Sequence, residues 1–348
     1  MKTAVIALTK NGSQMARHIA SKLDADVYLK REFMDHIDTE GRIKPLDGDF
    51  GAFAGCVFNS YEALVFVMAC GIVVRAIAPY LKDKRQDPAV VVTDEKGRFA
   101  ISLISGHIGG ANKLAESIAG LTGGSAVITT ATDVNNMLAF DVFAKDNDCV
   151  IENMNDLKHI SSELVNGGKV ALCSDYPLDG VSRDNIIICS DSRRYKCSVV
   201  LSNRKVIESG PGKTLVIRPK NLIIGFGCKR GVSSEDVQNA VLDFLSVNNK
   251  SMLSVKCIAT VDLKQDEAGL LEFCREHRLP LKIIHRDAVS KVENMFSGSD
   301  FVKEKIGVAG VAEPCAVLAG DRAELICKKT VYRGITLAMS QEEKIYHI

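Results

Sequence analysis

The segment FAISLISGHIGGANKLAESIAG, residues 99–120, contains a strand pattern, a turn and a helix pattern in direct succession. FAISLI is a short apolar run of strand-forming residues, and residues 112–121 repeat apolar side chains at the helical period. Between them Gly106, Gly109 and Gly110 allow the backbone to turn tightly. A strand, a glycine-rich turn and a helix in this order are typical of α/β proteins.

The same alternation continues along nearly the whole chain, with apolar runs such as TAVIAL, ALVFVMA, AVVVTD, KVALCS, NLIIGFG and VKCIATVD. Strands that are apolar throughout indicate mainly parallel sheets flanked by helices. The 348 residues suffice for two or three such domains. Composition shifts predict an N-terminal α/β domain over residues 1–130, a middle region over residues 131–218 and a C-terminal α/β domain over residues 219–348. Within the middle region, residues 191–213 are rich in Ser, Arg, Lys and Gly, and we expect an irregular surface segment with one weak strand, CSVVLS.

Composition also limits the function. Lys and Arg total 44 against 43 Asp and Glu, so the net charge of +1 provides no general attraction for nucleic acid or an acidic membrane. No apolar run has the length of a signal peptide or a spanning helix. The eleven cysteines form no CxxC pair and lie mostly in apolar runs, as expected for reduced thiols. These features predict a cytoplasmic protein that binds neither nucleic acid nor membranes.

The turn in residues 99–120 is the first candidate site. Gly106, Gly109 and Gly110 let a ligand approach the backbone at a helix N-terminus, where a carboxylate or phosphate binds favourably. His107 can transfer a proton near neutral pH, and Ser105 adds a hydroxyl. In the alternative interpretation the glycines only satisfy the turn geometry and His107 caps the helix.

Two further polar clusters follow predicted strands. VITTATDVN offers the hydroxyls of Thr130 and Thr132 and the carboxylate of Asp133, which either caps a helix or orients a substrate. MACGIVVRAIAP places Arg75 within an apolar helix, where its guanidinium must find either a ligand carboxylate or a structural ion pair.

The C-terminal domain contains a similar turn, IIGFGCKRGVSSEDV. Gly227 and Gly231 allow a tight turn, and Lys229 and Arg230 supply positive charge beside it. With Asp262 near the end of the next strand, the pattern partly matches a dinucleotide-binding unit, but the spacing is GxGxxxG instead of GxGxxG. An NAD(P)-dependent oxidoreductase is therefore a weaker alternative. The chain has no Walker A or HExxH motif and no Cys/His spacing for a protein-held metal.

Taken together, these motifs resemble a known family. The stretch from MACGIVVRAIAP to SGHIGGANKLAESIA, followed by VITTATDVN, resembles the N-terminal signature of the cobalt-precorrin-5A hydrolase (CbiG) family of anaerobic cobalamin biosynthesis. GFGCKRGVSSEDV, IATVDLKQDEAGL, GVAGVAEPCAVLAG and GITLAMS resemble its C-terminal domain. The resemblance implies opening of the ring-A δ-lactone of cobalt-precorrin-5A and release of acetaldehyde to give cobalt-precorrin-5B. The cobalt then arrives with the substrate, and no other cofactor is expected.

Such a substrate suggests roles for the candidate residues. A flat macrocycle with a rim of carboxylates needs several separated anion sites, and lactone opening needs a base and donors for the developing oxyanion. His107 is the first choice for the base, and Asp133 either orients it or replaces it. The orienting donors would be Ser105 and the amides of Gly109 and Gly110. Contacts with substrate carboxylates would come from Arg75, Lys229 and Arg230.

A non-catalytic tetrapyrrole carrier or scaffold is the main alternative, because it would use the same anion sites without a base. The sequence also leaves open a homo-oligomer and transient contacts with other enzymes of the cobalamin pathway.

Overall fold

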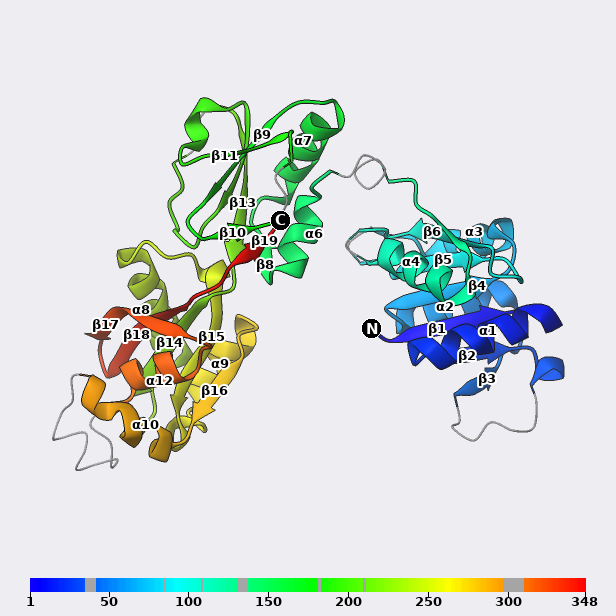
Figure 1. Cartoon of the computed structure of the whole chain (residues 1–348). Helices are drawn as coiled ribbons and strands as arrows, with labels where there is room; N and C mark the ends of the chain where they lie inside the picture. Colours follow the sequence, from blue (N-terminus) through cyan, green and yellow to red (C-terminus); the bar gives the residue numbers. More distant parts are fainter. Residues whose placement is uncertain are drawn as a thin grey trace. The chain divides into compact units, whose positions relative to one another are not determined.

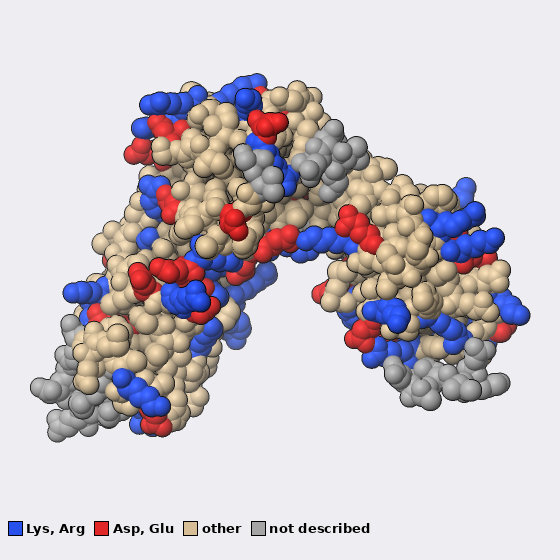
Figure 2. Space-filling view, viewed as in Figure 1, with Lys and Arg blue, Asp and Glu red and all other residues tan. Residues whose placement is uncertain are grey.

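A computed structural model describes residues 1–34, 42–83, 86–107, 109–130, 137–180, 183–208, 211–296 and 310–348 (Figure 1). The chain divides into two compact units, Met1–Val142 and Phe143–Ile348. The predicted domain boundaries near residues 130 and 218 stay predictions. No helix in the described ranges is long and apolar enough to span a membrane. Lys and Arg lie interspersed with Asp and Glu on the face in Figure 2, as the near-neutral composition leads one to expect.

The first unit is built on a seven-stranded sheet of order β3-β2-β1-β4-β5-β6-β7. Strands β1 to β5 are mutually parallel, whereas β6 is antiparallel to β5 and β7 is parallel to β6. The prediction of mainly parallel sheets is confirmed. The strands are β1 (Thr3–Ala7), β2 (Asp26–Leu29), β3 (Ile43–Pro45), β4 (Ala63–Val67), β5 (Ala89–Thr93), β6 (Phe99–Ile104) and β7 (Ser125–Val127).

Helices cover both faces of this sheet. One core cluster joins Ile19 and Ile118 to Val65, so α1 (Lys10–Leu23) and α4 (Ala111–Thr122) share a face. A second cluster joins Phe58 and Ile77 to Phe66, so α2 (Phe50–Ser60) and α3 (Cys70–Ile77) cover the other face. Burial on both faces explains why the central strands are apolar throughout.

Helix α6 (Phe140–Asp146) spans the boundary between the two units. The second unit contains a five-stranded sheet of order β11-β9-β12-β13-β8. Strand β8 is antiparallel to its neighbour, and the other strands are parallel. These strands are β8 (Cys149–Ile151), β9 (Val170–Ser174), β11 (Ile186–Ile188), β12 (Cys197–Leu201) and β13 (Lys213–Pro219). All five residues of β12 are buried. The expectation of a weak strand in an irregular surface segment was therefore wrong for CSVVLS, because β9 and β13 enclose it. Helix α7 (Met154–Val165) packs on β12 and β13.

The other five-stranded sheet of this unit has the order β16-β15-β14-β18-β17. Strands β14 to β16 are parallel, β18 is antiparallel to β14, and β17 is antiparallel to β18. Core clusters place α8 and α9 on one face and α10 and α12 on the other. The elements are β14 (Leu222–Cys228), α8 (Ser234–Val247), β15 (Val255–Val261), α9 (Ala268–Glu276), β16 (Leu281–Ile284), α10 (Arg286–Val292), α12 (Ala312–Leu318), β17 (Ala323–Val331) and β18 (Ile335–Glu342).

Short elements complete the two units. A parallel pair of β10 (Leu178–Asp179) and β19 (Tyr346–His347) attaches the end of the chain to the middle region. The 3-10 helices are η1 (Arg31–Phe33), η2 (Ala78–Tyr80), η3 (Ser192–Arg194), η4 (Met252–Ser254), η5 (Asp262–Lys264) and η6 (Glu293–Met295).

Gly225 lies inside β14 and allows α12 to pack closely on that strand. A Cβ atom at this position would lie 1.8 Å from the carbonyl oxygen of Ala312. No side chain fits there, so glycine is required by packing between strand and helix.

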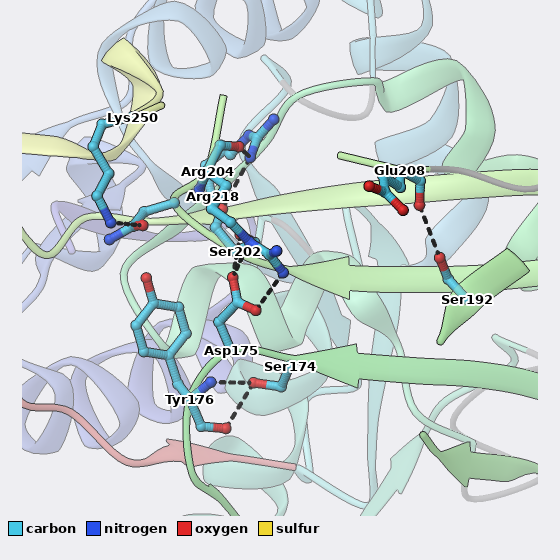
Figure 3. A network of polar contacts seen from close by, with 10 residues as sticks. Ser174, Asp175, Tyr176, Ser192, Ser202, Arg204, Glu208, Arg218 and Lys250 are labelled. Atoms are coloured by element: carbon cyan, nitrogen blue, oxygen red, sulfur yellow. Dashed lines mark hydrogen bonds and ion pairs between the residues drawn. The ribbon is translucent and has the colours of Figure 1, made fainter. Parts of the chain in front are cut away.

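A buried guanidinium on β13 connects the segments that follow β8 and β12 in the middle sheet. Arg218 is 2% exposed, and it donates to Glu152 and to the carbonyl oxygens of Ser202 (3.1 Å) and Arg204. The carboxylate of Asp175 in turn accepts a hydrogen bond of 2.6 Å from Arg204 (Figure 3).

The same network continues into the C-terminal sheet. Lys250 donates to Asn203 over 2.8 Å, and the amide of Asn203 donates to Gln341 on β18 over 2.8 Å. Polar side chains therefore fix the middle region and the C-terminal sheet to each other.

Candidate functional site

The turn between β6 and α4 is closed by its own backbone. Ser105 has a φ of 57°, in the left-handed region, and its hydroxyl donates to the carbonyl of Asp87 over 3.0 Å. The amide of Gly110 donates to the carbonyl of His107 over 3.0 Å, and the amide of Asn112 donates to the carbonyl of Gly106 over 3.0 Å. The half-buried His107 therefore lies in a turn in which its own carbonyl and that of Gly106 are both hydrogen-bonded. Of the two amides predicted to bind an oxyanion, that of Gly110 is already bonded within the turn.

The three glycines each meet a separate steric requirement. Gly110 has a φ of 90° and precedes α4 directly. A Cβ on Gly109 would lie 2.4 Å from the Cβ of Ser105, and one on Gly106 would lie 2.6 Å from Oδ1 of Asn112. Side chains at these positions would open the turn and displace His107.

Asn112, which was not among the predicted site residues, connects the first two predicted clusters. Its side chain is in the first turn of α4, and the residue is only 7% exposed. It accepts a hydrogen bond of 2.6 Å from Ser102 on β6 and donates one of 3.1 Å to the hydroxyl of Thr130. The structure thus brings Thr130 to the His107 turn. Thr132 and Asp133 lie outside the described residues.

Arg75 follows the carboxyl end of β4, whereas the His107 turn lies at the opposite end of the central strands. Because β6 is antiparallel to β5, Ile104 pairs with Val90, and the His107 turn lies where β4 and β5 begin. Helix α3 follows the opposite end of β4. The exposed guanidinium of Arg75 folds back onto the carbonyl of Gly71 near that end, over 3.1 Å. The structure therefore does not bring Arg75 to His107.

The predicted C-terminal residues lie where β14 ends. Gly227 is opposite Thr336 on β18, and the amide of Lys229 donates to the carbonyl of Gly334 over 2.8 Å. Arg230 is exposed, 3.6 Å from an equally exposed Asp266. Lys229 and Arg230 thus lie at the carboxyl end of a parallel strand, where ligands bind in open α/β sheets.

Comparison with known proteins places this chain in a family. Three family models match the chain: cobalamin synthesis G N-terminal over residues 52–133, cobalamin biosynthesis central region over residues 138–219 and cobalamin synthesis G C-terminus over residues 222–340. A cobalt-precorrin-5A hydrolase from Priestia megaterium is 32% identical, covering 97% of this chain and 94% of the relative. The chain belongs to the cobalt-precorrin-5A hydrolase family. A second member, from Salmonella typhimurium, is 33% identical and covers 97% of this chain and 96% of the relative.

Among solved structures, a homologue of cobalamin biosynthesis protein G from Sulfolobus solfataricus is 22% identical, with a TM-score of 0.41. The match covers 98% of this chain and 97% of that one. In this chain, the His107 turn falls within the N-terminal family match (residues 52–133). The Lys229 turn falls within the C-terminal family match (residues 222–340).

Further charged residues, at the carboxyl ends of β15 and β16 in the C-terminal sheet, were not predicted as site residues. Asp262, directly after β15, accepts a hydrogen bond of 3.0 Å from Arg286 and lies 3.6 Å from Nε2 of His285. Both partners follow β16, which is parallel to β15. The strand endings VD and IHRD are the sequence signal: Asp262 comes directly after an apolar run, and Arg286 comes one residue after the next, behind His285.

A buried ion pair holds the Lys229 turn in place. Glu267 is 5% exposed, and it accepts hydrogen bonds of 3.0 Å from Lys264 and from the amide of Gly231, whose φ is 80°. Burial raises the pKa of Glu267, but the Gly231 amide and the Lys264 ammonium outweigh burial and leave the pKa below its usual value. The carboxylate is therefore ionised and fixes the turn.

We expect Glu267→Gln to lower the free energy of unfolding at pH 7 by about 1–3 kcal/mol. Because the folded-state pKa is lowered, this stabilisation is complete above the ordinary glutamate value of 4.5 and is lost as the pH falls through the folded pKa. The difference between wild type and variant should therefore shrink below pH 4.5 in urea titrations. Glu235→Gln, at an exposed glutamate on α8, is the control. A difference that persists unchanged at pH 3.5 would contradict the role of the charge.

Proposed function

We propose that this chain hydrolyses cobalt-precorrin-5A, opening its ring-A δ-lactone and releasing acetaldehyde to give cobalt-precorrin-5B. The observation that carries the proposal is the match, over 97% of the chain, to two relatives named for the hydrolysis of cobalt-precorrin-5A. The cobalt enters with the substrate, and the reaction uses no other cofactor. The protein works in the cytoplasm, as a homo-oligomer or in transient contact with other enzymes of the pathway.

His107 acts as the base in this proposal. It accepts a proton from water as the water oxygen attacks the lactone carbonyl, and it returns the proton to the alkoxide when the ring C–O bond breaks. The products of this step are a hydroxyl and a carboxylic acid, and the acid releases its proton to solvent and becomes a carboxylate. Subsequent carbon–carbon cleavage releases acetaldehyde and needs a second proton transfer. The closed turn supports the role, because the Gly110 and Asn112 amides hold the carbonyls of His107 and Gly106 in place.

Groups around His107 complete the reaction site. The hydroxyl of Ser105 and the amides of Gly109 and Gly110 stabilise the developing oxyanion, with the Gly110 amide exchanging its bond to the carbonyl of His107 for one to substrate. Asp133 orients the imidazole. Gly106, Thr130 and Thr132 contact the part of the substrate around the lactone, and Asn112 keeps Thr130 beside the turn.

Carboxylates elsewhere on the macrocycle bind to separate cations. Lys229 and Arg230 at the end of β14 bind substrate carboxylates, and Gly227 lets the substrate approach the strand end. Arg75 forms another such contact, away from the lactone. The near-neutral net charge supports local recognition, because the chain has no general positive field to draw in an anion.

The proposal is tested by incubating the purified chain with cobalt-precorrin-5A under anaerobic conditions and trapping acetaldehyde as a hydrazone. We expect acetaldehyde and the mass of cobalt-precorrin-5B to appear together. A carrier would bind the tetrapyrrole and return it unchanged. Turnover that requires added NAD(P) would instead favour the oxidoreductase alternative.

We expect Lys229→Ala and Arg230→Ala each to raise KM for the substrate by about 3- to 10-fold and to leave kcat nearly unchanged. A single carboxylate contact stabilises bound substrate and transition state equally, so its loss weakens binding without slowing the chemical step. Lys328→Ala, at an exposed lysine on β17, is the control. A variant that binds normally but loses turnover would assign the Lys229 turn to the chemistry.

A further inference from the structure

Two cysteines on neighbouring strands of the middle sheet lie in contact. Ile188 at the end of β11 pairs with Leu172 on β9, and the amide of Cys189 donates to the carbonyl of Leu172 over 3.1 Å. Cys189 therefore lies beside Cys173. The two Sγ atoms are 2.7 Å apart, and both thiols are free.

The backbone geometry at this position suits a disulfide. Adjacent strands are about 4.8 Å apart, which falls within the Cα separation of about 4.4–6.8 Å that disulfides span. The sulfur atoms would have to move together by only about 0.7 Å to reach bonding distance. Formation of the bond therefore requires rotation of side chains and no rearrangement of the sheet.

We propose that Cys173 and Cys189 form a reversible dithiol–disulfide pair that reacts with low-molecular-mass disulfides such as oxidised glutathione. The Cys189 thiolate attacks the reagent, so a mixed disulfide forms and one reduced thiol leaves. Cys173 then loses its proton, attacks Sγ of Cys189 and displaces the second reduced thiol. The protein loses two electrons and two protons, and the reagent gains them.

The environments of the two thiols assign the order of attack. Cys173 is buried, and burial together with the hydrogen bond to Cys189 raises the pKa of its thiol to about 12. A protonated thiol is a poor nucleophile, so Cys173 does not begin the exchange. Cys189 is half-buried at the end of an edge strand, where the reagent can reach it.

The bond would fix an edge strand to a network that the protein already uses. Strand β11 is the edge of the middle sheet, and Asp175, two residues after Cys173, accepts hydrogen bonds from Ser202 and Arg204 (Figure 3). The disulfide would close a loop of residues 174–188 and so reduce the freedom of the unfolded chain. We therefore expect oxidation to raise the melting temperature by several °C.

The test is to incubate the native full-length protein with oxidised glutathione, alkylate the remaining thiols and map peptides without reduction. We expect a peptide pair crosslinked through Cys173 and Cys189, lost again on treatment with dithiothreitol. Cys189→Ser should abolish the crosslink and the rise in melting temperature. Cys56→Ser, which removes an exposed cysteine on α2, should leave both unchanged.

The wild-type protein alone can overturn the proposal, whatever the variants do. If Cys173 and Cys189 both remain alkylatable in native protein after oxidation, the pair does not react as proposed. The same holds if crosslinks scatter among other cysteines as they do in urea-unfolded protein. Neither outcome affects the proposed hydrolysis, since neither cysteine has a part in it.

Discussion

His107→Ala is expected to lower the turnover of lactone opening by about two to four orders of magnitude, the usual contribution of a general acid or base. The variant removes the imidazole and leaves the closing bonds of the turn in place, because these run between backbone atoms and through Ser105. Substrate affinity should change little, since the proposed carboxylate contacts lie elsewhere. The measurement is the single-turnover rate of acetaldehyde release with substrate in excess of Kd.

The control for this variant is His159→Ala, at an exposed histidine on α7. Circular dichroism and thermal unfolding of His107→Ala should match the wild type, so that a loss of rate is not a loss of fold. Near-normal turnover would remove His107 from the chemistry and make Asp133 the leading candidate for the base.

Arg218→Met should have the largest effect on stability, lowering the free energy of unfolding of the second unit by about 3–5 kcal/mol. The fully buried guanidinium donates to Glu152 and to the carbonyls of Ser202, Arg204 and Lys205. Methionine fills similar space without any donor, so these acceptors lose their partner in a buried setting.

Arg204→Met is the matched control, because Arg204 belongs to the same network but is 55% exposed and pairs with Asp175 near solvent. Its loss should cost about 1 kcal/mol or less. Urea titration followed by far-ultraviolet circular dichroism gives both values. Equal losses for the two variants would show that burial of Arg218 does not set its contribution.

Local sequence was sufficient to predict the fold class. Strands such as β4 and β5 are apolar at every position except Thr93, and a strand with no polar face must be covered on both sides. The burial of β12 was not predictable in the same way. Its flanking residues are polar, and only pairing with β9 and β13, formed by distant segments, encloses it.

The direction of a strand is likewise absent from a local pattern. The apolar run of β6 would look the same in either direction. Its reversal relative to β5 nevertheless places the His107 turn at the beginning of β5, whereas the helix of Arg75 follows the opposite, carboxyl end of β4. The glycines of the turn were predictable, because their neighbours are close in sequence. The contact between Asn112 and Thr130 spans 18 residues, and that between Asp262 and Arg286 spans 24, so both depend on which strands are adjacent.

The most direct test of hydrolysis is turnover of cobalt-precorrin-5A by the purified chain in oxygen-18-labelled water. Attack of water on the lactone carbonyl predicts one labelled oxygen in the new carboxylate of the tetrapyrrole and an equal amount of acetaldehyde. Labelling should slow with the rate of turnover in His107→Ala. Recovery of the tetrapyrrole unchanged and unlabelled, with no acetaldehyde, would contradict the proposed hydrolysis.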